Sequence, residues 1–197
     1  MSAALPNILT ALRLVAVPVM VLLLLADDGA EGPDRWWGLL VFLIAGATDF
    51  LDGYLARRWA VVSTFGKLAD PIADKVLILA ALAMISLIDG IGWWAFIVLA
   101  LREIAVTVGR LMVAGDTVIA ASQGGKIKTA LQAGAITLFL WPNAAPWVDV
   151  VAYVLLVAAV VLALVTGYDY MRRIVAARRH QRAVDGGHQG SRPDVAA

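Results

Sequence analysis

The chain is organised around Asp49-Phe50-Leu51-Asp52-Gly53-Tyr54-Leu55-Ala56-Arg57, a stretch that Gly66, Asp70 and Asp74 follow. It places four carboxylates in or beside segments that otherwise have the composition of membrane helices, where an unpaired charge costs about 2.5–3.5 kcal/mol on insertion scales. Residues three or four apart share one face of a helix, so Asp49 pairs with Asp52 and Asp70 pairs with Asp74. Such a cluster needs a strong cationic partner.

Carboxylate oxygens without accompanying His or Cys indicate a hard cation, which means magnesium, manganese or calcium. The chain has no cysteine, so disulfides and thiolate metal sites are excluded. Two magnesium-like ions held by shared carboxylates suit phosphoryl chemistry, because they polarise a phosphate and neutralise the leaving group. The small residues Gly53 and Ala56 allow a nucleotide or a neighbouring helix to approach the backbone. Arg57 can then pair with a phosphate.

The composition is that of an integral membrane protein. Hydrophobic residues make up 61% of the 197 residues, which is too many for a soluble domain with a wet surface. Apolar segments long enough to span a bilayer alternate with short polar connections. The six segments cover approximately 6–26, 36–58, 70–88, 93–113, 126–141 and 147–165.

The basic residues orient these segments. Six spans place both termini on one side, and with the termini inside, Arg35 is the one basic residue of the outer connections. The inner connections hold Arg57, Arg58, Lys67, Lys126, Lys128 and the C-terminal arginines. The positive-inside rule then places both termini and the aspartate cluster at the cytoplasmic face of the cell membrane. We predict an all-α membrane protein over residues 1–176, with six transmembrane helices enclosing a polar cavity at the cytoplasmic side. A basic, disordered cytoplasmic tail over 177–197 completes the prediction.

The spacing Asp49-x2-Asp52-Gly53-x2-Ala56-Arg57-x8-Gly66-x3-Asp70-x3-Asp74 resembles the full signature of the CDP-alcohol phosphotransferase family. Members are membrane enzymes, typically homodimers, that transfer a phosphatidyl or related group from a CDP-linked donor to an alcohol and release CMP. The resemblance covers about residues 6–132. It implies that Asp49 and Asp70 bridge two ions of Mg²⁺ or Mn²⁺ and that Asp52 completes one metal site. It also implies that Asp74 helps to hold the other ion and accepts the proton of the alcohol.

The resemblance further implies a set of residues that contact the donor, CDP-diacylglycerol. Pro6-Asn7-x2-Thr10-x2-Arg13 is similar to the first-helix segment of the family, which helps to form the nucleotide pocket. The expected donor-binding residues are Asn7, Thr10, Gly53, Ala56, Arg57 and Ser63. Close helix packing is an alternative role for Gly53 and Ala56, and satisfying local backbone groups is one for Ser63.

Downstream residues bear on the choice of the acceptor alcohol. Arg102-Glu103-Ile104, with Gly125-Lys126-Ile127-Lys128-Thr129 and Gln132, resembles the branch of the family that uses sn-glycerol 3-phosphate and makes phosphatidylglycerophosphate. A phosphorylated acceptor needs cations beside the metals, and those available are Arg102, Arg110, Lys126 and Lys128. Anchoring at the cytoplasmic boundary is the competing role for each of them. We expect Glu103 to pair with one of these cations rather than to act in catalysis.

Alternatives to this assignment remain open. Within the same family, a cardiolipin synthase or a phosphatidylinositol phosphate synthase would depend differently on Lys126 and Lys128. A divalent-cation transporter belongs to another class, because aspartate clusters in membranes also mark ion pathways. The fixed spacing of the motif and the lack of a long internal repeat argue against it. The aspartates could also cap helices and pair with Arg57, Arg58 and Lys75. No nucleic-acid partner is expected, because the C-terminal arginines suit an anionic leaflet.

Overall fold

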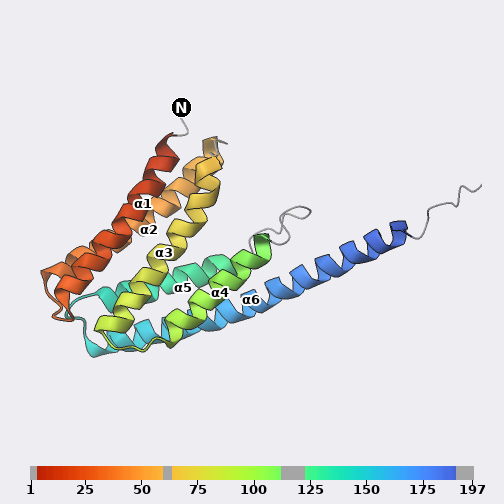
Figure 1. Ribbon diagram of the computed structural model, residues 1–197. Coiled ribbons are helices and arrows are strands. Elements are labelled where there is room, and N and C mark those ends of the chain that lie inside the picture. The colour runs from red at the N-terminus through yellow and green to blue at the C-terminus, as the bar shows by residue number, and fades with distance from the viewer. Residues whose placement is uncertain (1–3, 60–63, 112–122, 190–197) are drawn as a thin grey trace, which may run out of the picture.

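The structure is a computed structural model that describes residues 4–59, 64–111 and 123–189, with side chains over 11–48, 75–109 and 124–172 (Figure 1). Every element in these ranges is a helix, so the predicted all-α class is confirmed for the described part of the chain. The elements are α1 (Ala4–Asp27), α2 (Pro33–Trp59), α3 (Thr64–Ile88), α4 (Trp94–Leu111), α5 (Gln123–Leu140) and α6 (Pro146–Gln189).

Two helices differ in extent from the sequence prediction. Helix α3 begins at Thr64 instead of about Asp70, so Gly66 and the second aspartate pair lie in one continuous helix. Helix α6 continues to Gln189 and therefore includes residues for which the sequence predicts a disordered tail. Residues 176–183 are mostly Ala, Arg and Gln, which favour helix, and extending an existing helix requires no new nucleus. Residues 190–197 lie outside the described part.

The six helices of the described part form two groups that α2 and α3 join. Helices α1, α2 and α3 pack together, and α6 packs against α5 and α4. Between the groups, α3 contacts both α4 and α5, and α2 contacts α5. Figure 1 shows that the connections 28–32, 89–93 and 141–145 gather at one end of the molecule, which we call the closed end. The N-terminal end of α1 and the C-terminal end of α2 lie away from it. Helix α6 extends well beyond the other helices.

The hydrophobic core lies towards the closed end. Its fully buried large side chains come from the C-terminal halves of α1, α3 and α5 and from the N-terminal halves of α4 and α6. They are Met20, Leu24, Leu82, Ile85, Leu99, Ile136, Leu140 and Leu156. Fully buried alanines from α3, α4, α5 and α6 allow close helix contact; they include Ala81, Ala95, Ala135 and Ala152. The opposite ends of the helices are therefore where polar chemistry can be accommodated.

Arg35 at the start of α2 ties the closed end together. Its guanidinium donates to both carboxylate oxygens of Asp89, at 2.8 and 2.7 Å, and to the carbonyl oxygen of Phe139 at 2.7 Å. The carboxylate of Asp27 lies 3.7 Å away. Burial opposes the charge of Arg35, but the hydrogen bond to Asp89 and the charges of Asp89, Asp27 and Glu31 outweigh burial and raise its pKa. Arg35, the one basic residue of the predicted outer connections, thus links the start of α2 to the end of α3 and to α5.

We expect Arg35→Lys to destabilise the folded chain by about 2 kcal/mol, because lysine cannot reproduce the bidentate contact with Asp89. Thermal unfolding in detergent micelles, followed by far-ultraviolet circular dichroism, measures the change. The matched control is Arg172→Lys, since the Arg172 side chain is exposed on α6. Equal unfolding midpoints for Arg35→Lys and the unsubstituted chain would show that Arg35 does not clamp the closed end.

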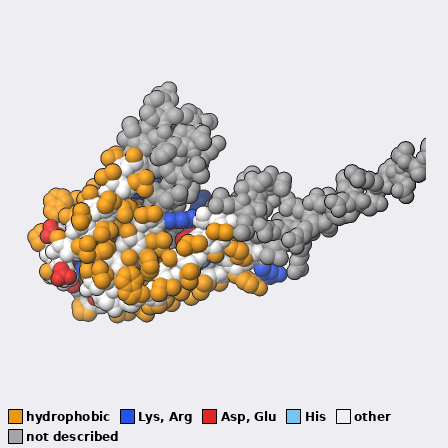
Figure 2. Space-filling model, in the orientation of Figure 1, with side chains coloured by type: hydrophobic (Ala, Val, Ile, Leu, Met, Phe, Trp, Pro, Cys, Tyr) orange, Lys and Arg blue, Asp and Glu red, His pale blue; other side chains and the backbone are white. Residues whose placement is uncertain are grey.

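The exterior of the described part is strongly apolar. Large hydrophobic side chains such as Leu22, Ile104, Val154 and Leu164 are exposed, and hydrophobic atoms cover most of the described face in Figure 2. Soluble monomers rarely expose such continuous apolar area. Within the described residues, one helix is long and apolar enough by length and composition to cross a membrane, Pro146–Arg172 of α6. This exterior suits contact with lipid more than contact with water.

Candidate functional site

The helices that carry the predicted aspartate cluster are neighbours. Asp49 and Asp52 belong to α2, Asp70 and Asp74 belong to α3, and these two helices pack against each other. The four carboxylates lie outside the described side chains, so the metal site stays a prediction. The surroundings of six more predicted site residues are also outside the description, although their helices are known: Asn7 and Thr10 in α1, Gly53, Ala56 and Arg57 in α2, and Arg110 in α4. Ser63 lies outside the described residues altogether.

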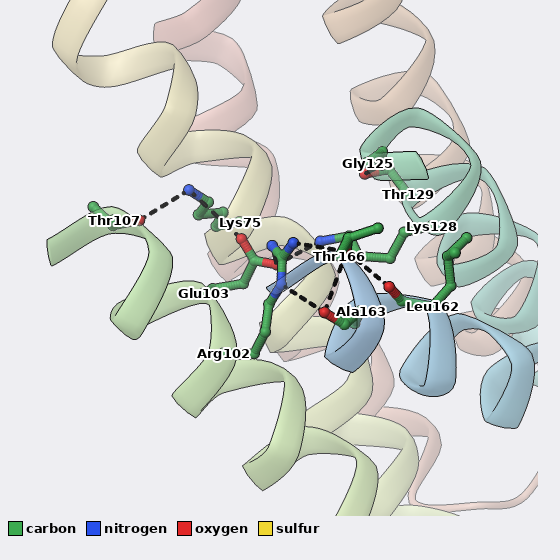
Figure 3. Close-up of polar contacts among 10 residues, drawn as sticks. All are labelled: Lys75, Arg102, Glu103, Thr107, Gly125, Lys128, Thr129, Leu162, Ala163 and Thr166. Carbon is green, nitrogen blue, oxygen red and sulfur yellow. Dashed lines mark hydrogen bonds and ion pairs between the residues drawn. The ribbon is translucent and has the colours of Figure 1, made fainter. Parts of the chain in front are cut away.

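Four charged side chains from three helices meet beside the aspartate-bearing helix α3, and we call them the Glu103 cluster (Figure 3). Glu103 of α4 is buried. Its Oε1 accepts hydrogen bonds from Nη1 of Arg102, at 2.8 Å, and from Nζ of Lys128. Its Oε2 lies 3.6 Å from Nζ of Lys75. The prediction that Glu103 pairs with a nearby cation is confirmed, and its carboxylate forms ion pairs with three cations, Lys75, Arg102 and Lys128.

Lys75 brings α3 into the cluster. It directly follows Asp74 in the sequence, and its Nζ donates a hydrogen bond to Oγ1 of Thr107 on α4 at 3.1 Å. Sequence reasoning considered Lys75 only as a salt-bridge partner for the aspartates and missed it as a site residue. Its place at the boundary of an apolar segment, next to a candidate catalytic residue, could have predicted that Lys75 belongs to the site.

Arg102 is fastened to the last helix. Its Nε donates to the carbonyl oxygen of Ala163 at 3.2 Å, and its Nη2 donates to Oγ1 of Thr166 at 3.1 Å. A Cβ atom on Gly167 would lie 3.3 Å from Cγ of Arg102, which is a tight contact. The absence of a side chain at this glycine therefore lets Arg102 cross the backbone of α6. Sequence reasoning gave α6 no part in the site, because these contacts join residues more than sixty positions apart.

A small pocket lies at the Glu103 cluster. Its charged lining groups are Lys75, Glu103 and Lys128, and the remaining lining residues are Ile78, Leu79, Thr129 and Gln132. Figure 2 shows basic and acidic side chains gathered at one place within the apolar face. The pocket thus offers two ammonium groups, one carboxylate, one amide and one hydroxyl as polar partners for a small ligand.

The four predicted acceptor-phosphate residues occupy different environments. Lys128 is buried and lines the pocket. Arg102 belongs to the Glu103 cluster but is not among the lining residues. Lys126, two residues before Lys128 on α5, is exposed and does not line the pocket. Arg110 lies in α4, two turns beyond Arg102, and its side chain is outside the description.

In its described part the protein is all-helical, with an apolar exterior and a pocket lined by two lysines and a glutamate, features that suit a membrane protein with a functional polar site. The chain belongs to the CDP-alcohol phosphatidyltransferase family, whose model matches residues 3–165. It is therefore an enzyme, and the predicted family is confirmed. The match continues into α6, beyond the region that the motifs cover.

Individual relatives resemble most of the chain. A probable phosphatidylglycerophosphate synthase of Mycobacterium tuberculosis is 45% identical over 171 residues, which are 87% of this chain and 81% of that protein. The CDP-diacylglycerol–glycerol-3-phosphate 3-phosphatidyltransferase of Bacillus subtilis is 36% identical, with 86% of this chain and 94% of that protein covered. The protein of the same name from Rickettsia typhi is 34% identical over 85% of this chain and 95% of its own length.

Proposed function

We propose that this enzyme transfers the phosphatidyl group of CDP-diacylglycerol to sn-glycerol 3-phosphate, giving phosphatidylglycerophosphate and CMP. A hydroxyl oxygen of the acceptor forms the new bond to the phosphorus that carries diacylglycerol. The bond from that phosphorus to the oxygen of CMP breaks, and CMP leaves. Relatives whose names state this reaction support the assignment. The observation that carries it is the basic pocket beside α3, which suits an acceptor that is itself phosphorylated.

Two divalent ions, Mg²⁺ or Mn²⁺, are part of the proposal. The donor set fits them, because four carboxylates on two packed helices offer oxygen ligands to a hard cation. Asp49 and Asp70 would bridge the ions, with Asp52 on one and Asp74 on the other. When bound, the ions would supply charge neutralisation for the phosphates and the leaving CMP. Asp74 also accepts the proton that the attacking hydroxyl loses.

The donor nucleotide is assigned to the ends of α1 and α2 that lie away from the closed end. The proposed contacts are Asn7, Thr10, Gly53, Ala56, Arg57 and Ser63. The packing of α1 against α2 supports this grouping. Within that contact, Nε of the buried Arg13 donates to the carbonyl oxygen of Ala45 at 3.3 Å. This bond holds the two helices together on the approach to the nucleotide-binding segments.

The acceptor is assigned to the pocket at the Glu103 cluster. Among the predicted phosphate ligands, Lys128 has the strongest support because it lines that pocket. Arg102 shares the carboxylate of Glu103 with Lys128, and Arg110 and Lys126 are proposed on charge alone. Lys75, which directly follows the proposed base Asp74 in α3, also lines this pocket, so α3 contributes to both the acceptor site and the proposed catalytic centre.

We also propose six membrane spans, with both termini and a polar cavity at the cytoplasmic face. Three observations support this topology: the apolar exterior, the even number of helices in the described part, and the gathering of the three predicted outer connections at the closed end. The distribution of Lys and Arg gives the orientation. The family resemblance supports a homodimer surrounded by membrane lipid.

Release of CMP by the purified enzyme tests the acceptor. With CDP-diacylglycerol and Mg²⁺ or Mn²⁺ present, we expect sn-glycerol 3-phosphate to support turnover, whereas glycerol does not, because glycerol lacks the phosphate that the basic pocket binds. Inositol phosphate and phosphatidylglycerol serve as the competing acceptors. Full activity with either of these, and none with glycerol 3-phosphate, would replace the proposed acceptor by that of another branch of the family.

A further inference from the structure

The cations of the Glu103 cluster differ in whether they face the pocket. Lys75 and Lys128 line it, and Arg102 does not. The Lys75 side chain is 27% exposed and the Lys128 side chain is 8% exposed. Arg102 instead directs Nε and Nη2 to the backbone and side chain of α6. A ligand in the pocket would therefore meet the two lysines, whereas Arg102 is linked to the pocket only through the carboxylate that it shares with Lys128.

The two lysines sit on either side of the Glu103 carboxylate. Lys128 donates to Oε1, and Nζ of Lys75 lies 3.6 Å from Oε2. An ammonium group has three N–H donors. The hydrogen bond of Lys75 to Thr107 uses one of these donors. The distance from Nζ of Lys75 to Oε2 of Glu103 is too long for a direct hydrogen bond. Lys75 thus keeps donor capacity for a ligand while Glu103 and Thr107 hold its position.

The charge of the cluster matches a phosphate monoester. Lys75, Arg102 and Lys128 contribute three positive charges and Glu103 one negative charge, which leaves two positive charges. A phosphate monoester carries about −1.5 to −2 near neutral pH. A single lysine would leave part of that charge uncompensated inside a largely apolar protein.

We propose that Lys75 binds the phosphate group of the acceptor together with Lys128, and that Glu103 positions both ammonium groups. This inference rests on the proposed function, because it names residues that would recognise glycerol 3-phosphate. Lys75 and Asp74 are consecutive residues of α3, so the proposed phosphate ligand and the proposed base belong to the same helical turn.

The test is the kinetics of CMP release by the full chain, with each substrate varied in turn. We expect Lys75→Met to raise KM for glycerol 3-phosphate about ten- to a hundredfold, the range for losing a charge-assisted hydrogen bond. KM for CDP-diacylglycerol and kcat should change less than about threefold, because an interaction present in both ground and transition states is removed. Lys75→Arg should recover most of the affinity, since it keeps the charge.

Two further variants separate binding from bulk charge and from folding. Arg172→Met removes an exposed cation from α6 and should leave KM for glycerol 3-phosphate unchanged. Thr107→Val removes the hydroxyl that holds Lys75 and should raise the same KM by about two- to tenfold, because the lost hydrogen bond positions Lys75 and does not itself bind the phosphate. It tests the inference even where Lys75→Met fails to fold.

The outcomes distinguish this inference from the proposed function. If the unsubstituted enzyme turns over glycerol 3-phosphate while both the Lys75→Met and Thr107→Val variants keep its KM, the function stands and the role of Lys75 is overturned. A change confined to KM for CDP-diacylglycerol, or to kcat, also overturns it, because Lys75 would then serve the donor or the catalytic centre. An unsubstituted enzyme that neither binds nor uses glycerol 3-phosphate overturns both.

Discussion

Asp74→Asn is expected to lower kcat for CMP release about 10²- to 10⁴-fold, the usual contribution of a general base. Asparagine has nearly the same size as aspartate, but it cannot take a proton from the acceptor hydroxyl and it is a weaker ligand for a divalent cation. Asp74 lies within α3, so the substitution should leave the helix and its packing in place. The loss should therefore appear in turnover and not in folding.

Donor binding is the informative second measurement for Asp74→Asn. Apart from Ser63, the proposed nucleotide contacts lie on α1 and α2, and Asp74 is not among them. The affinity for CDP-diacylglycerol should therefore stay within about threefold of that of the unsubstituted enzyme, as for a residue that acts mainly in the transition state. The matched control is Asp149→Asn, because Asp149 is an exposed carboxylate in the first turn of α6. Unchanged turnover in Asp74→Asn would remove Asp74 from the mechanism.

Helix number and position were largely predictable from the sequence, because each helix of the described part coincides with one apolar segment between polar turns. The ends were less predictable. The sequence predicts a helix start at about Asp70, yet α3 begins at Thr64, because local capping preference is weak compared with the advantage of extending a packed helix. Helix α6 continues through the basic segment that follows its apolar part, because charged residues do not by themselves terminate a helix.

The candidate site was predictable only where its signal is local. The aspartate motif and the pairing of Glu103 follow from sequence, since ionisable residues in apolar segments need partners. The roles of Lys75, Thr107 and Gly167 were not predictable, because they depend on which helices pack together and in which register. Arg102 shows this most clearly. It contacts α6 through Ala163 and Thr166, more than sixty residues away, and no periodicity in one chain encodes that pairing.

Glu103→Gln is expected to destabilise the folded enzyme by about 3–5 kcal/mol, as for removing one partner from a buried ion pair. The substitution keeps the shape of the side chain but removes the negative charge that Lys75, Arg102 and Lys128 share. Unfolding by sodium dodecyl sulfate in mixed micelles, followed by tryptophan fluorescence, gives the free energy of unfolding. In the control Asp149→Asn, an exposed carboxylate at a helix start is lost, and the cost should stay below about 1 kcal/mol.

Combining Glu103→Gln with Lys128→Met shows whether the loss arises from this pair. Lys128→Met alone leaves Glu103 with Arg102 and Lys75, so its cost should be smaller, about 1–3 kcal/mol. The double variant should lose about 1–3 kcal/mol less than the sum of the single losses, because residues in direct contact are coupled. Strict additivity would mean that the two side chains do not interact in the folded enzyme. The double variant should also keep a raised KM for glycerol 3-phosphate, since recovering stability does not restore the ammonium group that binds the phosphate.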